Sequence, residues 1–597
     1  MAPKEKQVSP EAQHRVMHMN PEIERERQMI LDAEKKGKGA LFKVYVKLSG
    51  PGWLQSGITL GGGSLSSSLY LGVLVGFSFM WLQPLAMILG VIMLSAIAYV
   101  TLSTGQRPLR PINEHVSPVL GWGWLLASMM ANLVWSLPQF ALGTAAIRQN
   151  LLPGLIGPES GVPEIQGKMV AGAIFLIIAL TATLTYSAGG KGVKVFEVMI
   201  KSIVSLIVLC FIGVVIKLSV SGKIQWSNIL AGLIPDLDLF MRPTDEIMPH
   251  IKRVAEPFQA FWTNMIVGQQ RDVMISAAAT AVGINMTFLL PYSMLRKGWD
   301  KYFRGLAIFD LSTGLFIPFM IATGCVVIAS GSQFHAEPAQ GFVAAEPGGQ
   351  ITGEPAPNLV GPYNTLLKQR ALSELVIQDE RFENIGAGDY EDLSPELQAV
   401  IDSKVESLPW ADKRMAAVLV KRDAFNLAET LAPLTGEVWA QYIFGIGVIG
   451  MALSAATMLM TINGLCFCEL LNKPARGWPQ RIGSLMVVVG ALGPFFWKDA
   501  APYLAVPTSV FAMVLLPIAY FAFFLLMNQK TFMGKNMPRG GRRILWNVLM
   551  ALASGAAAFG SIWSLWSKLQ WLGIILFICF IALCVVVHFV RKKPQTA

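Results

Sequence analysis

Small and polar residues gather near the start of the first long apolar stretch of the chain. They are Gly61, Gly62, Gly63, Ser64, Ser66, Ser67 and Ser68. Each glycine inside a helix costs roughly 1 kcal/mol relative to alanine, so a continuous helix is not expected here. A broken membrane helix exposes backbone amides and carbonyls, which are tolerated at that depth only inside protein or along a cavity. The stretch therefore predicts a site at a helix break.

The chemistry of this stretch favours an anion. A helix N-terminus carries roughly half a positive charge, and its amides bind anions. Glycine allows close backbone approach, and hydroxyls both donate and accept hydrogen bonds. An alternative is that the small residues only let helices pack closely. The substrate-binding residues predicted from this break are Gly61, Gly62, Gly63, Ser64 and Ser67.

A second interruption occurs between Gly283 and Pro291, in a later apolar stretch. Corresponding breaks in two halves of a chain indicate an inverted-repeat transporter with its site near the bilayer midplane. Asn285 and Thr287 are the predicted ligands from this break, and the Asn285 amide offers both a donor and an acceptor. Each of them could equally bond a neighbouring helix. Asn132 and Gln139, in an earlier span, are expected to hold helices together.

The composition indicates that these breaks lie in a membrane protein. The chain has 597 residues, of which 53% are hydrophobic and 14% are charged, and its mean hydropathy is +0.51. We expect an all-α polytopic membrane protein with twelve transmembrane helices. The apolar spans lie at about 50–74, 79–104, 120–148, 169–188, 194–217, 272–294, 304–330, 437–471, 482–497, 503–527, 544–566 and 570–590.

Several function classes are disfavoured. The six cysteines lie in or at the ends of apolar segments, which suggests neither disulfides nor a zinc site. No hydrolase triad, phosphate loop or nucleotide motif occurs, so we expect no enzyme, no catalytic residues and no bound cofactor. The net charge of +10 arises from basic residues that border the spans, so nucleic acid is not an expected partner.

Charge distribution also predicts topology. Basic residues are concentrated in alternate links, which places both termini on the cytoplasmic side of the cell (inner) membrane. The expected organisation is a cytoplasmic arm at 1–45, helices one to seven at 46–331 with an outside loop at 218–271, an outside segment at 332–436, and helices eight to twelve at 437–597.

The outside segment at 332–436 differs from the rest of the chain. Between residues 332 and 435 it holds 16 acidic residues against 8 basic ones. It begins rich in proline and glycine and then shows helical periodicity. We expect a small acidic helical insert, and both an appended cap and a partner-binding role are open, since loops of this length are usually functional or disordered.

Several motifs occur in order along the chain. They are Gly50-Pro51-Gly52-Trp53-Leu54, Tyr186 to Ala188, Gly192 to Glu197, Ala307 to Ser312, Ala452-Leu453-Ser454, Leu516 to Ala519, Asn528, and Met533-Gly534. With these motifs the chain resembles the Nramp family of metal-ion transporters. The resemblance implies a LeuT-type fold, a five-plus-five inverted repeat with helices one and six broken.

The resemblance departs from the family at the metal site. The family motif Asp-Pro-Gly-Asn aligns here with Gly61 to Ser64, and Met-Pro-His aligns best with Asn285-Met286-Thr287. The carboxylate and amide of helix one are absent, and Met286 lies one position from the family methionine. No transition-metal site is therefore expected. The chain looks like a branch of the superfamily that lacks the metal motif and is associated with sodium-coupled bicarbonate uptake.

A sodium site is predicted from the same resemblance. Ser454 and Thr457 lie three residues apart, on one helix face, where LeuT-type carriers bind sodium through hydroxyls and helix-one carbonyls. Thr59 is the third predicted ligand. Ordinary bonding between helices is the alternative for these hydroxyls.

Three charged residues fall within spans, and structural or gating roles are expected for them. Lys201 is expected to pair with Glu197, and Asp310 is expected to be wet at the inner end of helix seven.

The predicted function is secondary active transport of a small inorganic anion across the lipid bilayer, with bicarbonate favoured and sodium as the coupling ion. Transport of a divalent metal cation, magnesium or manganese, is one alternative. A non-transporting receptor on the same fold is another, with the acidic insert as its sensor.

Overall fold

The computed structural model describes residues 21–157, 160–187, 191–383, 385–423, 425–428, 436, 442, 444–495 and 505–590. Every regular element among them is a helix. Nine of these helices are long and apolar enough to cross a membrane, and the bent pair α4 (Pro51–Thr59) and α5 (Gly62–Val75) makes a tenth. The predicted all-α, multi-pass membrane fold is confirmed.

The spans follow the predicted order, with two broken ones. The first span consists of α4 and α5, which meet at 56°. The sixth consists of α14 (Glu256–Ala281) and α15 (Ile284–Lys297), separated by Val282 and Gly283. The other long helices are α6 (Leu82–Thr104), α8 (Pro118–Ala146), α10 (Glu164–Ser187), α11 (Lys191–Val220), α17 (Phe316–Phe334), α22 (Phe444–Leu470) and α24 (Ala505–Met527).

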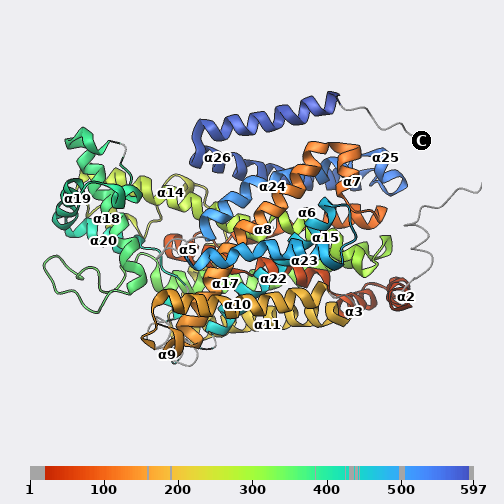
Figure 1. The fold of residues 1–597 in the computed structure, drawn as a ribbon, viewed down its shortest axis with the longest axis horizontal. Coiled ribbons are helices and arrows are strands. Elements are labelled where there is room, and N and C mark those ends of the chain that lie inside the picture. Colours follow the sequence, from red (N-terminus) through yellow and green to blue (C-terminus); the bar gives the residue numbers. More distant parts are fainter. Residues whose placement is uncertain are drawn as a thin grey trace, which may run out of the picture.

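Three predicted spans have unusual local structure. The ninth is α23 (Gly477–Met486) followed by a 3-10 segment, η10 (Val487–Phe495). The last two form α26 (Gly541–Val590), which reverses at Gln570, where φ is 48°. Figure 1 shows α26 folding back along the bundle. The twelve predicted spans are therefore consistent with the helices of the described residues.

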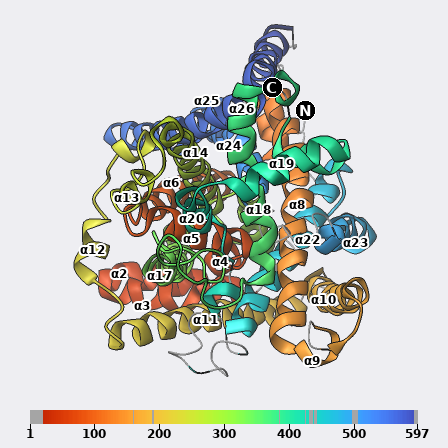
Figure 2. The same ribbon diagram turned by 90° about the vertical axis from the view of Figure 1, so that its left-hand side faces the viewer.

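The two ends of the elongated bundle differ. In Figure 1 the helices α18 (Pro357–Gln378), α19 (Pro395–Ser407) and α20 (Trp410–Leu419) lie at one end. The helices α2 (Pro21–Lys36) and α3 (Lys38–Leu48) lie at the other end. Figure 2 looks onto the end that carries α18, α19 and α20, which stand in front of the bundle. The 332–436 segment and the N-terminal helices thus project from opposite ends.

Both halves of the first span are attached to the seventh span. In α4, the Gly52 amide donates to the Asp310 carboxylate at 2.6 Å, and the Ser56 hydroxyl donates to the Gly314 carbonyl. In α5, Gly72 packs so closely on Ser330 that no Cβ would fit between them. The α4 attachment falls at a π-helical segment of the seventh span, η6 (Leu311–Leu315), which contains Gly314 and directly follows Asp310.

Candidate functional site

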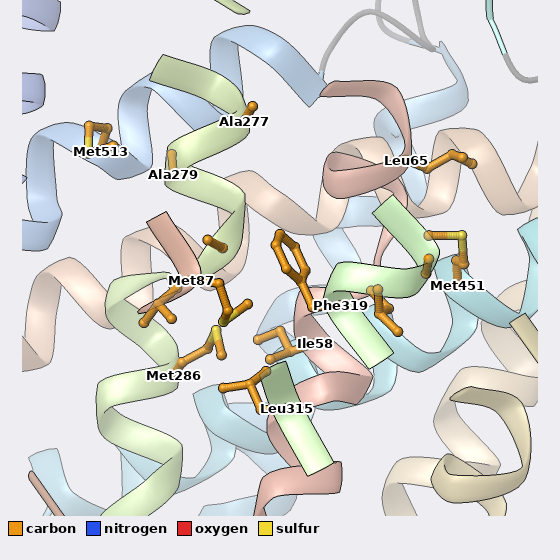
Figure 3. Packing of buried hydrophobic residues seen from close by; sticks show 14 of the residues in the cluster. Ile58, Leu65, Met87, Ala277, Ala279, Met286, Leu315, Phe319, Met451 and Met513 are labelled. Carbon is orange, nitrogen blue, oxygen red and sulfur yellow. The ribbon is translucent and has the colours of Figure 1, made fainter. Parts of the chain in front are cut away.

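The two helix breaks meet at a single cavity. Its volume is about 30 Å³, and it is lined from α4, α5, α8, α14, α15, α22 and α24. Figure 3 shows the apolar packing around this region, including Ile58 and Met286, which both line the cavity. None of the lining residues, all of them described, carries a charged side chain. The lining residues are Ile58, Thr59, Gly61, Gly63, Ser64, Trp135, Pro138, Gln139, Thr280, Gly283, Met286, Ala455, Leu459, Thr508 and Ser509.

The glycines of the first break face different neighbours. A Cβ added to Gly61 would lie 2.6 Å from the Ala455 Cβ, and one added to Gly62 would lie 2.7 Å from the Leu142 Cδ2. A Cβ on Gly63 would meet only Thr280 Cγ2 at 3.5 Å and Ser509 Oγ at 3.7 Å, which are ordinary contacts. Gly61 and Gly62 thus allow close helix packing, as the alternative interpretation proposed. Gly61 and Gly63 both line the cavity, but only Gly63 has room for a side chain.

The N-terminus of α5 is already bonded to an acceptor. The Gly62 amide donates to Gln139 Oε1 at 2.8 Å. The first amides of a helix have no acceptor within the helix itself. The amide oxygen of Gln139 therefore occupies the position that an anionic acceptor would take. Sequence reasoning assigned Gln139 to helix packing, because a single glutamine on an apolar helix gives no pattern that distinguishes the two roles.

The serines of the first break have different partners. The Ser64 hydroxyl lines the cavity and donates to the Thr59 carbonyl. Ser67 lies one turn further along α5, and its Oγ is 2.6 Å from the Ser276 Oγ of α14. Ser67 is not among the cavity-lining residues, and its hydroxyl joins α5 to α14 instead.

The predicted ligands of the second break lie away from the cavity in this structure, and their binding role stays a prediction. Asn285 and Thr287 do not line the cavity, because both side chains point toward α8. Asn285 Nδ2 donates to Asn132 Oδ1 at 3.2 Å, and Thr287 Oγ1 accepts from Trp124 Nε1 at 2.9 Å.

Met286 takes the cavity position instead, because neighbouring helical residues differ by about 100° in direction. Its sulfur lies 3.2 Å from Thr59 Oγ1 and 3.4 Å from the Gly283 amide nitrogen.

The hydroxyls predicted to bind sodium are all buried. Ser454 Oγ donates to the Gly57 carbonyl of α4 at 2.5 Å, and Thr457 Oγ1 donates to the Ser454 carbonyl at 2.9 Å. Thr59 Oγ1 instead contacts the Ala281 carbonyl at 3.4 Å, at the second break. A hydroxyl of α22 therefore meets a helix-one carbonyl as expected, but Thr59 bonds elsewhere. The sodium role of these residues stays a prediction.

The charged residues within spans form a different network from the one predicted. Glu197 pairs with Lys297 at 3.2 Å, and Lys201 donates to the Ser49 carbonyl at 3.0 Å. Asp310 is 1% exposed rather than wet. Its carboxylate accepts from the Gly50 and Gly52 amides at 3.0 and 2.6 Å, and so binds the start of α4.

Comparisons with known proteins agree with this fold. The sequence model of the "Natural resistance-associated macrophage protein-like" family matches residues 414–567. A histidine-to-alanine mutant of the Eremococcus coleocola manganese transporter is similar in structure, with a TM-score of 0.57 at 11% identity over 92% of this chain and 94% of that one. The same transporter in complex with an aromatic bis-isothiourea compound gives 0.57 at 12% identity over 92% and 95%. No curated protein matches the sequence.

These comparisons confirm the predicted resemblance to the Nramp family and the LeuT-type fold. The structural likeness spans nearly the whole chain, whereas the family match lies in the C-terminal part.

Proposed function

We propose that the chain is a secondary active transporter that moves a small inorganic anion, with bicarbonate favoured, together with sodium. The observation that carries the proposal is the cavity at the two helix breaks, which has no charged side chain in its lining. A cavity needs about 10–15 Å³ to hold one water, so about 30 Å³ suits a small inorganic ion rather than an organic solute.

The uncharged lining favours an anion on electrostatic grounds. A cation that lost its hydration shell here would find no carboxylate, and the idealised cost of moving one ion into a medium of low dielectric constant is of order 20 kcal/mol. An anion would find the amides of the α5 N-terminus, whose partial positive charge is fixed by the fold. The hydroxyls of Thr59 and Ser64 lie in the same cavity. If the hydrogen bond between the Gly62 amide and Gln139 broke, the Gly62 amide would become one more donor for the anion.

The coupling to sodium is supported by the contact between α22 and α4. The Ser454 hydroxyl and the Gly57 carbonyl are 2.5 Å apart, and both offer oxygen atoms that sodium prefers. A sodium ion bound by both oxygens, in place of this hydrogen bond, would connect the eighth span to α4. We place both termini on the cytoplasmic side of the cell (inner) membrane, in accordance with the basic residues of the alternate links.

A divalent metal cation is the second candidate, and one observation favours it. The Met286 thioether reaches the cavity, and thioether sulfur is a soft ligand. The structural relatives named above are also manganese transporters by their descriptions. Thr59, Ser64 and backbone carbonyls would have to supply the remaining ligands.

Flux measurements on the purified protein separate the two candidates. Labelled bicarbonate is added to the medium outside proteoliposomes, with and without an inward sodium gradient. Parallel samples receive manganese or magnesium in place of bicarbonate. We expect bicarbonate uptake that rises with the sodium gradient and exceeds that of protein-free liposomes. Manganese or magnesium flux without bicarbonate flux would overturn the proposal.

A further inference from the structure

A polar seam leads from the cavity toward the end of the bundle that carries the insert. Gly63 of α5 faces Thr280 of α14 at the cavity. One turn further, Ser67 Oγ lies 2.6 Å from Ser276 Oγ, and both residues are fully buried. These residues repeat at four-residue intervals, so they lie on one face of each helix.

The next contact along the seam joins Tyr70 to α14. The Tyr70 hydroxyl donates to Gln269 Oε1 at 2.6 Å. The facing surfaces of α5 and α14 are therefore closed by two successive hydrogen bonds, those of Ser67 and Tyr70. Any route from the cavity to the outside along this seam requires both to part.

The insert, which we define as residues 332–383, 385–423 and 425–428, contacts the C-terminal end of α5. The Lys421 ammonium lies 5.0 Å from the centroid of the Tyr70 ring. The His335 Nδ1 lies 3.1 Å from the Val73 carbonyl oxygen. On its other side, the His335 ring lies 3.6 Å from the Glu246 carboxylate, and this hydrogen-bonding partner lowers the pKa of Glu246. The insert is thus attached to α5 at two successive turns.

The insert also holds α14 through a buried ionic contact. Asp412 Oδ1 accepts from Trp262 Nε1 of α14 at 2.7 Å and from Arg370 Nε at 2.8 Å. The Arg370 guanidinium carbon lies 3.4 Å from the centroid of the Phe258 ring, also on α14. Trp262, Arg370 and Asp412 are each at most 1% exposed. A buried charge that loses one partner is strongly destabilised, so this contact is a firm one.

We infer that the insert is the outer gate of this protein. It fastens the outer ends of α5 and α14 to each other, and these two helices form the seam above the cavity. While the insert is attached, the seam stays closed, and its release from either helix allows the cavity to open outward. The inference rests on the proposed transport function for its purpose, but the closure of the seam can be measured without any substrate.

The experiment places a reporter thiol within the seam. Ser276→Cys is introduced into the full-length protein, and a membrane-impermeant methanethiosulfonate reagent is added from outside. The rate of modification is compared with that of the parent, which accounts for the native cysteines. The gate variants are Trp262→Phe, which keeps the ring but removes the donor to Asp412, and Lys421→Gln, which removes the charge over Tyr70.

A matched control lies within the insert but away from the bundle. Tyr390→Phe removes the hydrogen bond between the Tyr390 hydroxyl and the Asp402 carboxylate, at 2.6 Å in an exposed position. We expect the reporter to react about tenfold faster in each gate variant. The scale is set by loss of one hydrogen bond to a charged group in Trp262→Phe and of one buried cation–π contact in Lys421→Gln. We expect a change of less than about twofold in Tyr390→Phe, because an exposed bond contributes little.

Equal reporter rates in the parent, the gate variants and the control would overturn the inference, as would rapid modification with the intact insert. If Trp262→Phe does not reach the membrane, Lys421→Gln, at a partly buried position over Tyr70, decides alone. The expected reporter pattern without bicarbonate flux would leave the gate standing and reject the anion. Bicarbonate flux without the reporter pattern would support the anion proposal and reject the gate.

Discussion

The first helix break lines the cavity with backbone and hydroxyl groups, whereas the second break presents Gly283 and the sulfur of Met286 there. The polar side chains of the second break, Asn285 and Thr287, bond to α8 instead. The two halves of an inverted repeat thus share a backbone feature but not a chemistry. In the proposed site the first break would supply the donors, and the second break bonds to the helices around it.

The largest expected effect on bicarbonate uptake comes from placing a negative charge at Gly63 in the first break. Gly63→Asp puts a carboxylate into the cavity at the position that has room for a side chain. Two like charges about 4 Å apart repel by about 4 kcal/mol at an effective dielectric constant of 20, so bicarbonate uptake falls by at least about 100-fold. Initial uptake rates in proteoliposomes measure the effect.

The isosteric control at this position is Gly63→Asn, which adds the same volume without the charge. We expect the Asn variant to keep uptake within about tenfold of the parent, because a Cβ at Gly63 makes only ordinary contacts with Thr280 and Ser509. Equal losses in both variants would show that volume, not charge, governs this position. Gly62 is less informative, because a side chain there would first contact Leu142.

The contact between the first break and α22 predicts a smaller effect. Ser454→Ala removes the hydroxyl that meets the Gly57 carbonyl. The sodium concentration for half-maximal uptake should rise about tenfold, which corresponds to one lost bond to a charged group. The matched control is Ser128→Ala, which removes a hydroxyl-to-carbonyl bond within α8, and it should leave the sodium dependence unchanged.

The second break should affect stability rather than binding. Asn285→Ala removes the bond to Asn132 and leaves that buried amide without its partner, which costs about 1–3 kcal/mol. We expect a lower melting temperature in detergent, with the substrate concentration for half-maximal uptake unchanged. A double-mutant cycle with Asn132→Ala should show coupling between the two residues. A large change in apparent substrate affinity in Asn285→Ala would instead show that Asn285 takes part in substrate binding.

The smallest effect is expected for Met286→Leu. The two side chains have similar volumes, so an anion carrier should change its uptake by less than about twofold. A metal carrier would lose a soft ligand and with it most of its manganese flux. This substitution therefore separates the two candidate substrates at the second break, as Gly63→Asp does at the first.

The sequence predicted where the two helix breaks occur, but it did not predict which side chains of the second break point into the cavity. The glycine run at 61–63 and the interruption after Gly283 identify both breaks, because glycine destabilises a helix wherever it occurs. The rotation of α15 about its axis is set by packing against α8, through Trp124 and Asn132, so the choice of Met286 over its neighbours is not visible in the sequence.

Hydrogen bonds between residues far apart in the chain could not be predicted from the sequence either. Gln139 meets Gly62 across 77 residues, and Trp262 meets Asp412 across 150. Nothing in the local pattern of either helix distinguishes such a contact from an ordinary polar residue. The acidic composition of 332–436 indicated a separate element, but its attachment to α5 and α14 depends on a few buried side chains within it.

The attachment of the first span to the seventh has a mechanical consequence. α4 is fastened to the seventh span at Asp310 and Gly314, and α5 is fastened to it at Ser330. The α4 attachment coincides with the π-turn at Leu311–Leu315, where helical hydrogen bonding is irregular, because Gly314 lies within that turn. If both attachments hold, the 56° angle between α4 and α5 can change only when the seventh span bends between Gly314 and Ser330. The two halves of the first span are therefore mechanically coupled through the seventh span.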